Sequence, residues 1–173
     1  ASMLAWILEH AGLQPGFLIG GVPENFGVSA RLGNAPFFVV EADEYDTAFL
    51  ALDPAVAVVN NVEADHLECY GSFEALEEAF ATFAGRARLR LVGVDDPGAA
   101  RLAARLGPDT LRFGSAADAE LRISAVRQEE EWTSATVRLP GRDGVTLRLR
   151  VPGLHNLRNA TAALGVVHAL GGS

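Results

Sequence analysis

Hydrophobic and polar positions follow three different patterns along this chain, and each pattern predicts a different kind of element. Over residues 1–12 the apolar positions recur with the 3.6-residue period of a helix. Two short apolar runs, FFVVE at 37–41 and AVAVVN at 55–60, are typical of strands that are covered on both faces. Between residues 119 and 151 apolar and polar residues alternate, which predicts half-exposed antiparallel strands.

Capping and turn residues divide the remainder into further elements. Ser72 precedes a helical pattern that runs to Phe83, and Gly85 is expected to end that helix. Asp95-Asp96-Pro97 has the composition of a helix start. We further expect strands at 17–21, 88–94 and 110–114, helices at 97–106 and 157–170, a short helix before Pro54 and a turn at 141–144. Together these elements predict an α/β fold, with a mainly parallel sheet flanked by helices and a small antiparallel extension.

Composition restricts the class of protein. The chain has 173 residues, of which 49% are hydrophobic, enough for one well-buried domain. Its net charge of −8 argues against a nucleic-acid surface, which needs clustered cations. Apolar runs stay well below the roughly 20 residues of a membrane span. The N-terminal sequence ASMLAWILEH lacks the basic start of a secretion signal, and Cys69 is the only cysteine, so we expect a cytoplasmic protein without a membrane partner.

The chain contains no lysine, and arginine supplies all 14 of its basic residues. A phosphate-binding loop of the Gly-Lys-Ser/Thr type therefore cannot be present in this sequence. A Schiff-base or modified lysine is excluded for the same reason. Any nucleotide chemistry carried out by this chain alone would lack the usual phosphate-binding ammonium group.

The strand predicted at 37–41 ends in a dense acidic segment. Glu41 is followed by Asp43, Glu44 and Asp46, so four carboxylates lie within six residues. This density is unfavourable unless a positive charge offsets it. An ordinary solvated acidic loop is one interpretation, and a divalent metal site at the carboxyl end of a buried strand is the other.

The strand predicted at 55–60 leads to a second group of candidate ligands, Glu63, Asp65 and His66. We expect this strand to neighbour the one at 37–41. A single histidine is most often a surface or satisfied core residue. Together with a carboxylate, however, a neutral imidazole suits a divalent ion whose other positions are filled by phosphate oxygens and water. Asn60 and Asn61 would cap the loop or orient a ligand, and capping is the commoner role.

The last helix begins near His155, Asn156 and Asn159. Asn156 and Asn159 are three residues apart, so they share a face of a helix. An amide side chain can donate and accept at once, which matches the N6/N7 edge of adenine. Helix capping by asparagine explains the residue types equally well.

Taken in order, the motifs E-A-D-E-x-D, N-x-E-A-D-H and P-G-x-H-N-x-x-N resemble the central, ATP-binding domain of the Mur ligases, and the resemblance covers essentially the whole chain. It implies a fold like that of P-loop NTPases, with ATP and Mg²⁺ as cofactors. It also implies a longer enzyme, with a UDP-sugar-binding domain before residues 1–173 and a Rossmann-like domain after them. The family's phosphate loop would lie just before Ala1, so we expect the chain alone to be inactive.

The resemblance also implies roles for individual residues. Glu41 would bridge to Mg²⁺ near the γ-phosphate, and His66 would bind a second Mg²⁺, so both would serve catalysis. Asn156, with His155 beside it, matches the adenine-recognition position, and Asn159 belongs to the same motif. No oligomeric state is implied.

Within the family, the sequence is most similar to members that join L-alanine to UDP-N-acetylmuramate through an acyl phosphate. Tyr45, in Glu44-Tyr45-Asp46, instead resembles the members that attach a whole tripeptide to the same sugar. A non-catalytic domain that binds a nucleotide or a metal is the remaining alternative.

Overall fold

The computed structural model describes residues 1–172, whose strands form two sheets. A three-stranded sheet has the order β2-β1-β3, and a six-stranded sheet runs from β4 to β9 in chain order. The helices are α1 (Ser2–His10), α2 (Leu67–Tyr70), α3 (Phe73–Arg86), α4 (Pro97–Leu106), α5 (Leu154–Ala169) and the 3₁₀ helix η1 (Tyr45–Ala51). The strands are β1 (Gly16–Leu18), β2 (Ala30–Arg31), β3 (Phe38–Val40), β4 (Val56–Val59), β5 (Leu89–Gly93), β6 (Thr110–Gly114), β7 (Leu121–Gln128), β8 (Thr133–Leu139) and β9 (Arg142–Leu149).

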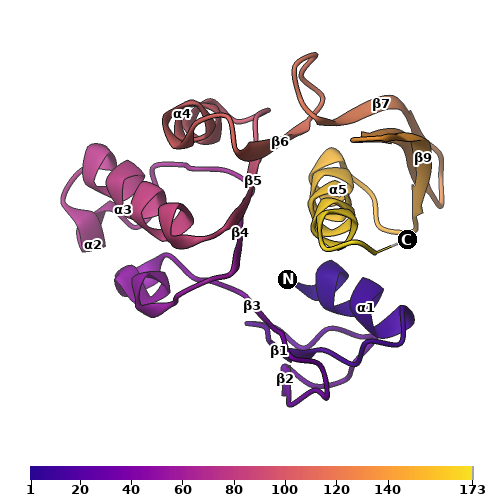
Figure 1. Cartoon of the computed structure of the whole chain (residues 1–173), viewed down its shortest axis with the longest axis horizontal. Coiled ribbons are helices and arrows are strands. Elements are labelled where there is room, and N and C mark those ends of the chain that lie inside the picture. The colour runs from indigo at the N-terminus through magenta and orange to yellow at the C-terminus, as the bar shows by residue number, and fades with distance from the viewer. Residues whose placement is uncertain (173) are drawn as a thin grey trace.

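The larger sheet confirms the predicted α/β class. Its strands β4 to β7 are parallel, whereas β7, β8 and β9 pair in antiparallel fashion. Helices α3 and α4 lie on one side of the parallel strands and α5 lies on the other, with the antiparallel strands curving around α5 (Figure 1). Leu91 and Val92, successive residues of β5, are fully buried in the two cores on opposite faces. No helix within residues 1–172 is both long and apolar enough to cross a membrane.

The smaller sheet corrects one prediction. Phe17 and Val39 face α1 and are buried, but Phe38 and Val40 on the opposite face are 47% and 37% exposed. The interpretation of residues 37–41 as a strand covered on both faces is therefore wrong, because only the face toward α1 is packed. The expectation that it neighbours the next strand is also wrong, since within residues 1–172 β3 pairs with β1 and β4 pairs with β5.

The ends of several elements also differ from the sequence prediction, and β1, for example, covers Gly16–Leu18 rather than 17–21. Helix α3 continues past Gly85 to Arg86, where a Cβ on Gly85 would meet nothing within 4 Å. Helix α5 starts at Leu154, three residues earlier than expected. The expected turn at 141–144 is tighter, since Leu139 pairs with Arg142 and Gly141, at φ +72°, helps to close the hairpin.

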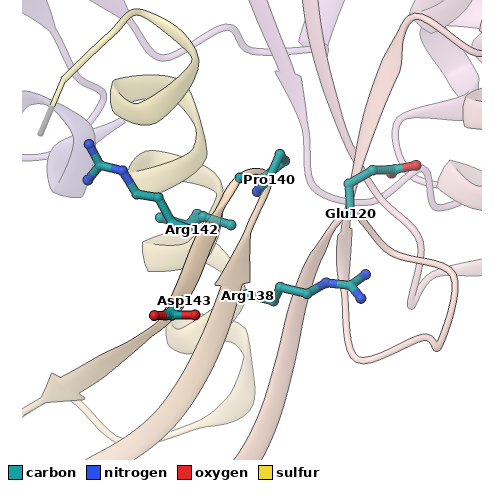
Figure 2. Close-up of a pocket in the computed structure, with 7 residues that line it drawn as sticks. Glu120, Arg138, Pro140, Arg142 and Asp143 are labelled. Carbon is teal, nitrogen blue, oxygen red and sulfur yellow. The ribbon is translucent and has the colours of Figure 1, made fainter.

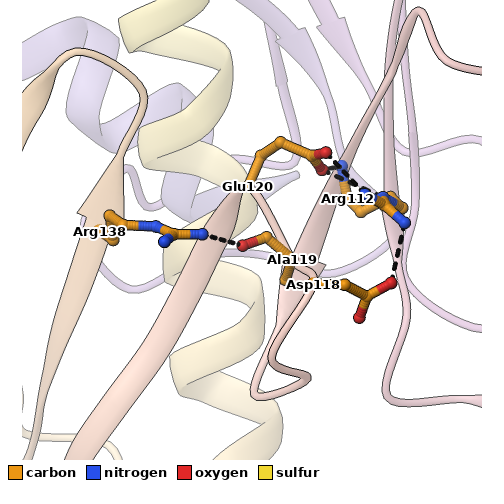
Figure 3. Close-up of polar contacts among 5 residues, drawn as sticks. All are labelled: Arg112, Asp118, Ala119, Glu120 and Arg138. Carbon is orange, nitrogen blue, oxygen red and sulfur yellow. Dashed lines mark hydrogen bonds and ion pairs between the residues drawn. The ribbon is translucent and has the colours of Figure 1, made fainter.

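Arg112 fixes the place where the parallel sheet becomes antiparallel (Figure 3). Its guanidinium lies 2.8 Å from Glu120 Oε1 and 2.8 Å from Asp118 Oδ2. On the other side of the same loop, Arg138 of β8 donates a hydrogen bond of 2.7 Å to the Ala119 carbonyl. Burial raises the pKa of Glu120, but the hydrogen bonds from Arg112 lower it by more, so the net pKa is lowered.

Candidate functional site

Glu41 leaves β3 beside two glycines and the start of α1. Its backbone N–H bonds to the Leu18 carbonyl at 2.9 Å, so it extends the pairing of β3 with β1. A Cβ on Gly20 would lie 3.5 Å from the Glu41 carboxylate, and one on Gly21 would meet nothing within 4 Å. The Glu41 carboxylate also lies near Ala1, the residue that precedes α1. Glu41 therefore borders an open area near a helix N-terminus, where anions are favoured.

The acidic segment after Glu41 has an unusual backbone conformation. Asp43 accepts a hydrogen bond of 2.9 Å from the backbone N–H of Tyr45. The next residues, Asp46 and Thr47, have φ values of 52° and 58°, in the left-handed region that a β-branched residue such as Thr47 rarely adopts. Such conformations cost free energy and cluster at functional sites. This backbone marks the segment as a candidate functional site.

His66 lies after β4, and neighbouring acidic side chains surround its ring. Its backbone, at φ 52°, is also left-handed. The imidazole Nδ1 is 3.7 Å from Glu68 Oε1 and 3.9 Å from Asp65 Oδ1, and the side chain is 35% exposed. Asn61 donates a hydrogen bond of 2.9 Å to Glu63 Oε1, so it orients an acidic side chain. The observed contact of Asn61 is thus with a side chain, and the N-cap position of α2 belongs to His66.

The loops after β3 and β4 meet although the two strands belong to different sheets. The Tyr45 ring contacts the His66 ring edge-on, with centroids 5.2 Å apart and an interplanar angle of 81°. The Tyr70 hydroxyl donates a hydrogen bond to the Glu44 carbonyl. Burial raises the pKa of Tyr70, and the charge of Glu44 raises it further. These contacts join the two predicted ligand segments, but they do not bring Glu41 and His66 into direct contact.

The residues present fit a metal ion that is shared with a phosphate group. Within residues 1–172, no three His, Cys, Asp or Glu side chains are grouped so that they could hold a metal by themselves. Mg²⁺, however, usually takes one or two protein carboxylates and completes its shell with phosphate oxygens and water. Among the described residues, the Glu41 carboxylate has no hydrogen-bond or ion-pair partner, so its oxygens are available.

The third predicted segment forms the first turns of α5. The His155 ring folds over Gly153, where a Cβ would be 2.6 Å from the His155 Cε1 atom. Asn156 Nδ2 donates a hydrogen bond of 2.7 Å to the Pro152 carbonyl. Because Gly153 is the N-cap and makes no side-chain cap bond, capping does not explain Asn156. Asn159 follows on the same helix, and both amides are partly exposed.

The turn that contains Asp95 and Asp96 connects these segments, and sequence reasoning identified it only as a helix start. Asp96 Oδ2 caps α4 through the Ala99 N–H at 2.7 Å and also accepts the Val62 N–H at 3.0 Å. Asp95 accepts Arg158 Nε at 2.7 Å. Burial raises the pKa of Asp95, but hydrogen bonds from Ser115 and Arg158 lower it by more, which keeps the carboxylate ionised.

Two surface cavities can be compared with this arrangement. The first, of about 480 Å³, is lined by Asp95, Ser115, Ile123, Val126, Gln128, Leu154, Leu157 and Arg158. The second, of about 600 Å³, lies at the β8–β9 turn, where Arg138 and Arg142 point away from each other (Figure 2). None of the predicted site residues lines the second cavity, and its arginines do not converge on one point. None of the predicted site residues lines the first cavity either, but Leu154, Leu157 and Arg158 of its lining flank His155 and Asn156 in sequence.

Known proteins resemble both the sequence and the fold. The UDP-N-acetylmuramate–L-alanine ligase of Thermobifida fusca is 42% identical over 98% of this chain, which spans 37% of that protein. The crystal structure of the UDP-N-acetylmuramate–alanine ligase from Thermotoga maritima matches 98% of the chain and 38% of its own length, with 28% identity and a TM-score of 0.84. The MurF ligase of Thermotoga maritima, solved with ADP, matches 99% of the chain and 42% of its own length, with 21% identity and a TM-score of 0.73. Residues 1–167 match the Mur ligase middle domain, and the chain therefore belongs to the Mur ligase family.

Proposed function

We propose that this chain is the ATP- and Mg²⁺-binding middle domain of a ligase of peptidoglycan precursor synthesis. The ligase would join L-alanine to UDP-N-acetylmuramate in the cytoplasm. The observation that carries this proposal is the meeting of the Glu41 and His66 segments, through Tyr45 and Tyr70, in a chain whose relatives have that name. In the proposed reaction the muramate carboxylate takes the γ-phosphoryl group of ATP, giving an acyl phosphate and ADP. The amine of L-alanine then attacks the acyl carbon, and phosphate leaves.

Each segment has a part in this proposal. Glu41 would hold one Mg²⁺ and His66 a second. Bound there, the ions would neutralise the charge that develops between phosphate and carboxylate. Tyr45 packs edge-on against the His66 ring and so limits the orientations that the imidazole can adopt. Asn156 and Asn159 would present amide groups to the adenine base, since an amide can donate and accept along one edge.

The chain alone is expected to be inactive. It contains no lysine to bind the phosphates, and it spans only about two fifths of its relatives. We infer that the lysine, the sugar site and the amino-acid site belong to other parts of a longer protein. An ADP-release assay with UDP-N-acetylmuramate and L-alanine checks this, and turnover by the 173-residue chain near that of the longer protein would contradict it.

Metal-dependent nucleotide binding tests the site directly. Titration calorimetry with Mg²⁺ and a non-hydrolysable ATP analogue should detect weak binding by the chain. Glu41→Gln and His66→Ala should each weaken it at least about tenfold, because even outer-shell partners of metal sites are worth 10- to 100-fold. Glu24→Gln, at another exposed carboxylate, is the matched control and should have no effect. If the longer protein also shows no Mg²⁺-dependent binding, only a structural domain remains.

A second substrate assignment rests on Tyr45. The Glu44-Tyr45-Asp46 sequence resembles ligases that attach a tripeptide to UDP-N-acetylmuramate, and the Tyr45 ring contacts His66. Comparing kcat/KM for L-alanine and for the tripeptide in the longer protein separates the two assignments. A preference for the tripeptide would replace the first proposal while leaving the nucleotide site intact.

A further inference from the structure

Arg158 occupies a special position between the two asparagines of the proposed adenine motif. It lies on α5 between Asn156 and Asn159, and its Nε donates a hydrogen bond of 2.7 Å to Asp95 Oδ2. The Asp95 side chain is only 9% exposed, although it carries a charge. Ser115 donates two hydrogen bonds to the other carboxylate oxygen, one of 2.8 Å from its backbone N–H and one of 2.9 Å from its hydroxyl. Asp95 thus holds the side chain of Arg158, a residue that lies 63 positions later in the sequence.

The surroundings of Asp95 leave little freedom for this ion pair to move. A Cβ on Gly114 would lie 2.6 Å from Asp95 Oδ1, so only a glycine allows the two segments to approach this closely. The adjacent Asp96 accepts the Val62 N–H at 3.0 Å. A Cβ on Gly98 would lie 2.1 Å from the Val62 carbonyl oxygen. One short turn therefore contacts both the beginning of α5 and the loop that leads to His66.

The body of α5 does not need the ion pair to stay in place. Leu157, Ala162 and Val166 are buried in the core shared with β5 to β8. The first turn is different, because Gly153 provides no side-chain cap and Leu154 is 49% exposed. The Arg158–Asp95 ion pair is thus the long-range polar contact nearest to this turn. A guanidinium held by a fixed carboxylate has a defined orientation, which a flexible ammonium does not.

Arg158 and Asp95 also line the cavity of about 480 Å³ together with Leu154 and Leu157. Its volume is in the range of small-molecule sites. Among the described residues, the terminal guanidinium nitrogens of Arg158 have no hydrogen-bond partner. Leu154, Leu157 and Arg158, which flank His155 and Asn156 in sequence, therefore belong to one wall of this cavity.

We propose that Asp95, acting through Arg158, is a positioning residue for adenine recognition: the ion pair sets where the first turns of α5 present the amide of Asn156. This inference rests on the proposed function. It predicts that the pair controls the choice of base, and that it contributes little to binding of the phosphates, which the Glu41 and His66 segments would hold with Mg²⁺.

The test compares base selectivity in the longer protein. Dissociation constants are measured with Mg²⁺ for non-hydrolysable ATP and GTP analogues and for tripolyphosphate, which has no base. Arg158→Gln should raise the dissociation constant of the ATP analogue about tenfold, a typical coupling between contacting groups. The dissociation constants of the other two ligands should not change. Arg158→Lys should recover part of the loss. Arg88→Gln, at an exposed arginine just before β5 and so at the opposite end of that strand from Asp95, is the control and should change nothing.

A double-mutant cycle separates positioning from general damage. The double variant Asp95→Asn/Arg158→Gln should bind the ATP analogue no more weakly than the single variant with the lower affinity, because both changes break the same contact. Equal weakening of all three ligands, or unchanged selectivity in Arg158→Gln, would overturn the positioning role. If the wild-type protein binds none of the three ligands, the proposed function itself fails, and the positioning role with it.

Discussion

Asp96→Ala should destabilise the fold more than the loss of a helix cap explains. The carboxylate accepts the Ala99 N–H at 2.7 Å as the N-cap of α4, and removal of such a cap costs about 1 kcal/mol. The same Oδ2 atom accepts the N–H of Val62, a residue that is only 3% exposed. Leaving a buried donor without a partner costs about 1–3 kcal/mol more. We therefore expect a total loss of about 2–4 kcal/mol in the free energy of unfolding.

Ser72→Ala provides the matched control. Ser72 caps α3 through the Ala75 N–H at 3.2 Å and makes no second bond of this kind, so its removal should cost only about 1 kcal/mol. Asp96→Asn keeps an acceptor oxygen and should fall between the wild type and Asp96→Ala. Urea unfolding followed by circular dichroism measures all three variants. If Asp96→Ala costs no more than Ser72→Ala, the bond to Val62 does not stabilise the loop and the reasoning is refuted.

Two further predictions concern packing and pH. Gly98→Ala should cost about 1–3 kcal/mol, since its Cβ would lie 2.1 Å from the Val62 carbonyl oxygen, whereas Gly85→Ala, with open space around it, should stabilise α3 by about 0.5–1 kcal/mol. Asp95 and Glu120 have lowered pKa values when folded. Their contribution is complete above the ordinary values of 3.8 and 4.5 and declines as the pH falls through the lower folded pKa values. The urea midpoint should drop accordingly between pH 6 and about pH 3, less steeply in Glu120→Gln, and parallel curves would contradict the assignment.

Local patterns predicted the elements whose signals lie within one segment. Ser72 caps α3 and Asp96 caps α4 as their sequences indicated, because a cap bond joins residues only three apart. Alternation between 119 and 151 gave the antiparallel strands for a similar reason, since the period of a strand reflects its own two faces. The burial of β3 could not be predicted from its own sequence. An apolar run shows that a strand can be covered, but the neighbouring elements determine whether Phe38 is covered.

The roles of the candidate site residues stay a prediction, and the sequence indicated their arrangement only in part. Strand ends with acidic residues and a histidine identified the two segments. That β3 and β4 lie in separate sheets was not visible, because pairing depends on contacts far apart in sequence. The contacts that join the segments come from the Tyr45 ring and the Tyr70 hydroxyl, and no pattern in the sequence indicated that these two groups would meet the opposite loop.

Asp95 did carry a signal of its long-range role. Pro97 occupies the start of α4, so Asp96 serves as the cap, and a single cap needs only one carboxylate. The preceding Asp95 is therefore not needed to cap the helix, yet it directly follows Val94 at the end of a buried strand. A charge in that position is costly unless a partner from elsewhere neutralises it. The partner is Arg158, 63 residues away. An acidic residue that makes no contact needed within its own turn therefore indicates an ion pair with a distant segment.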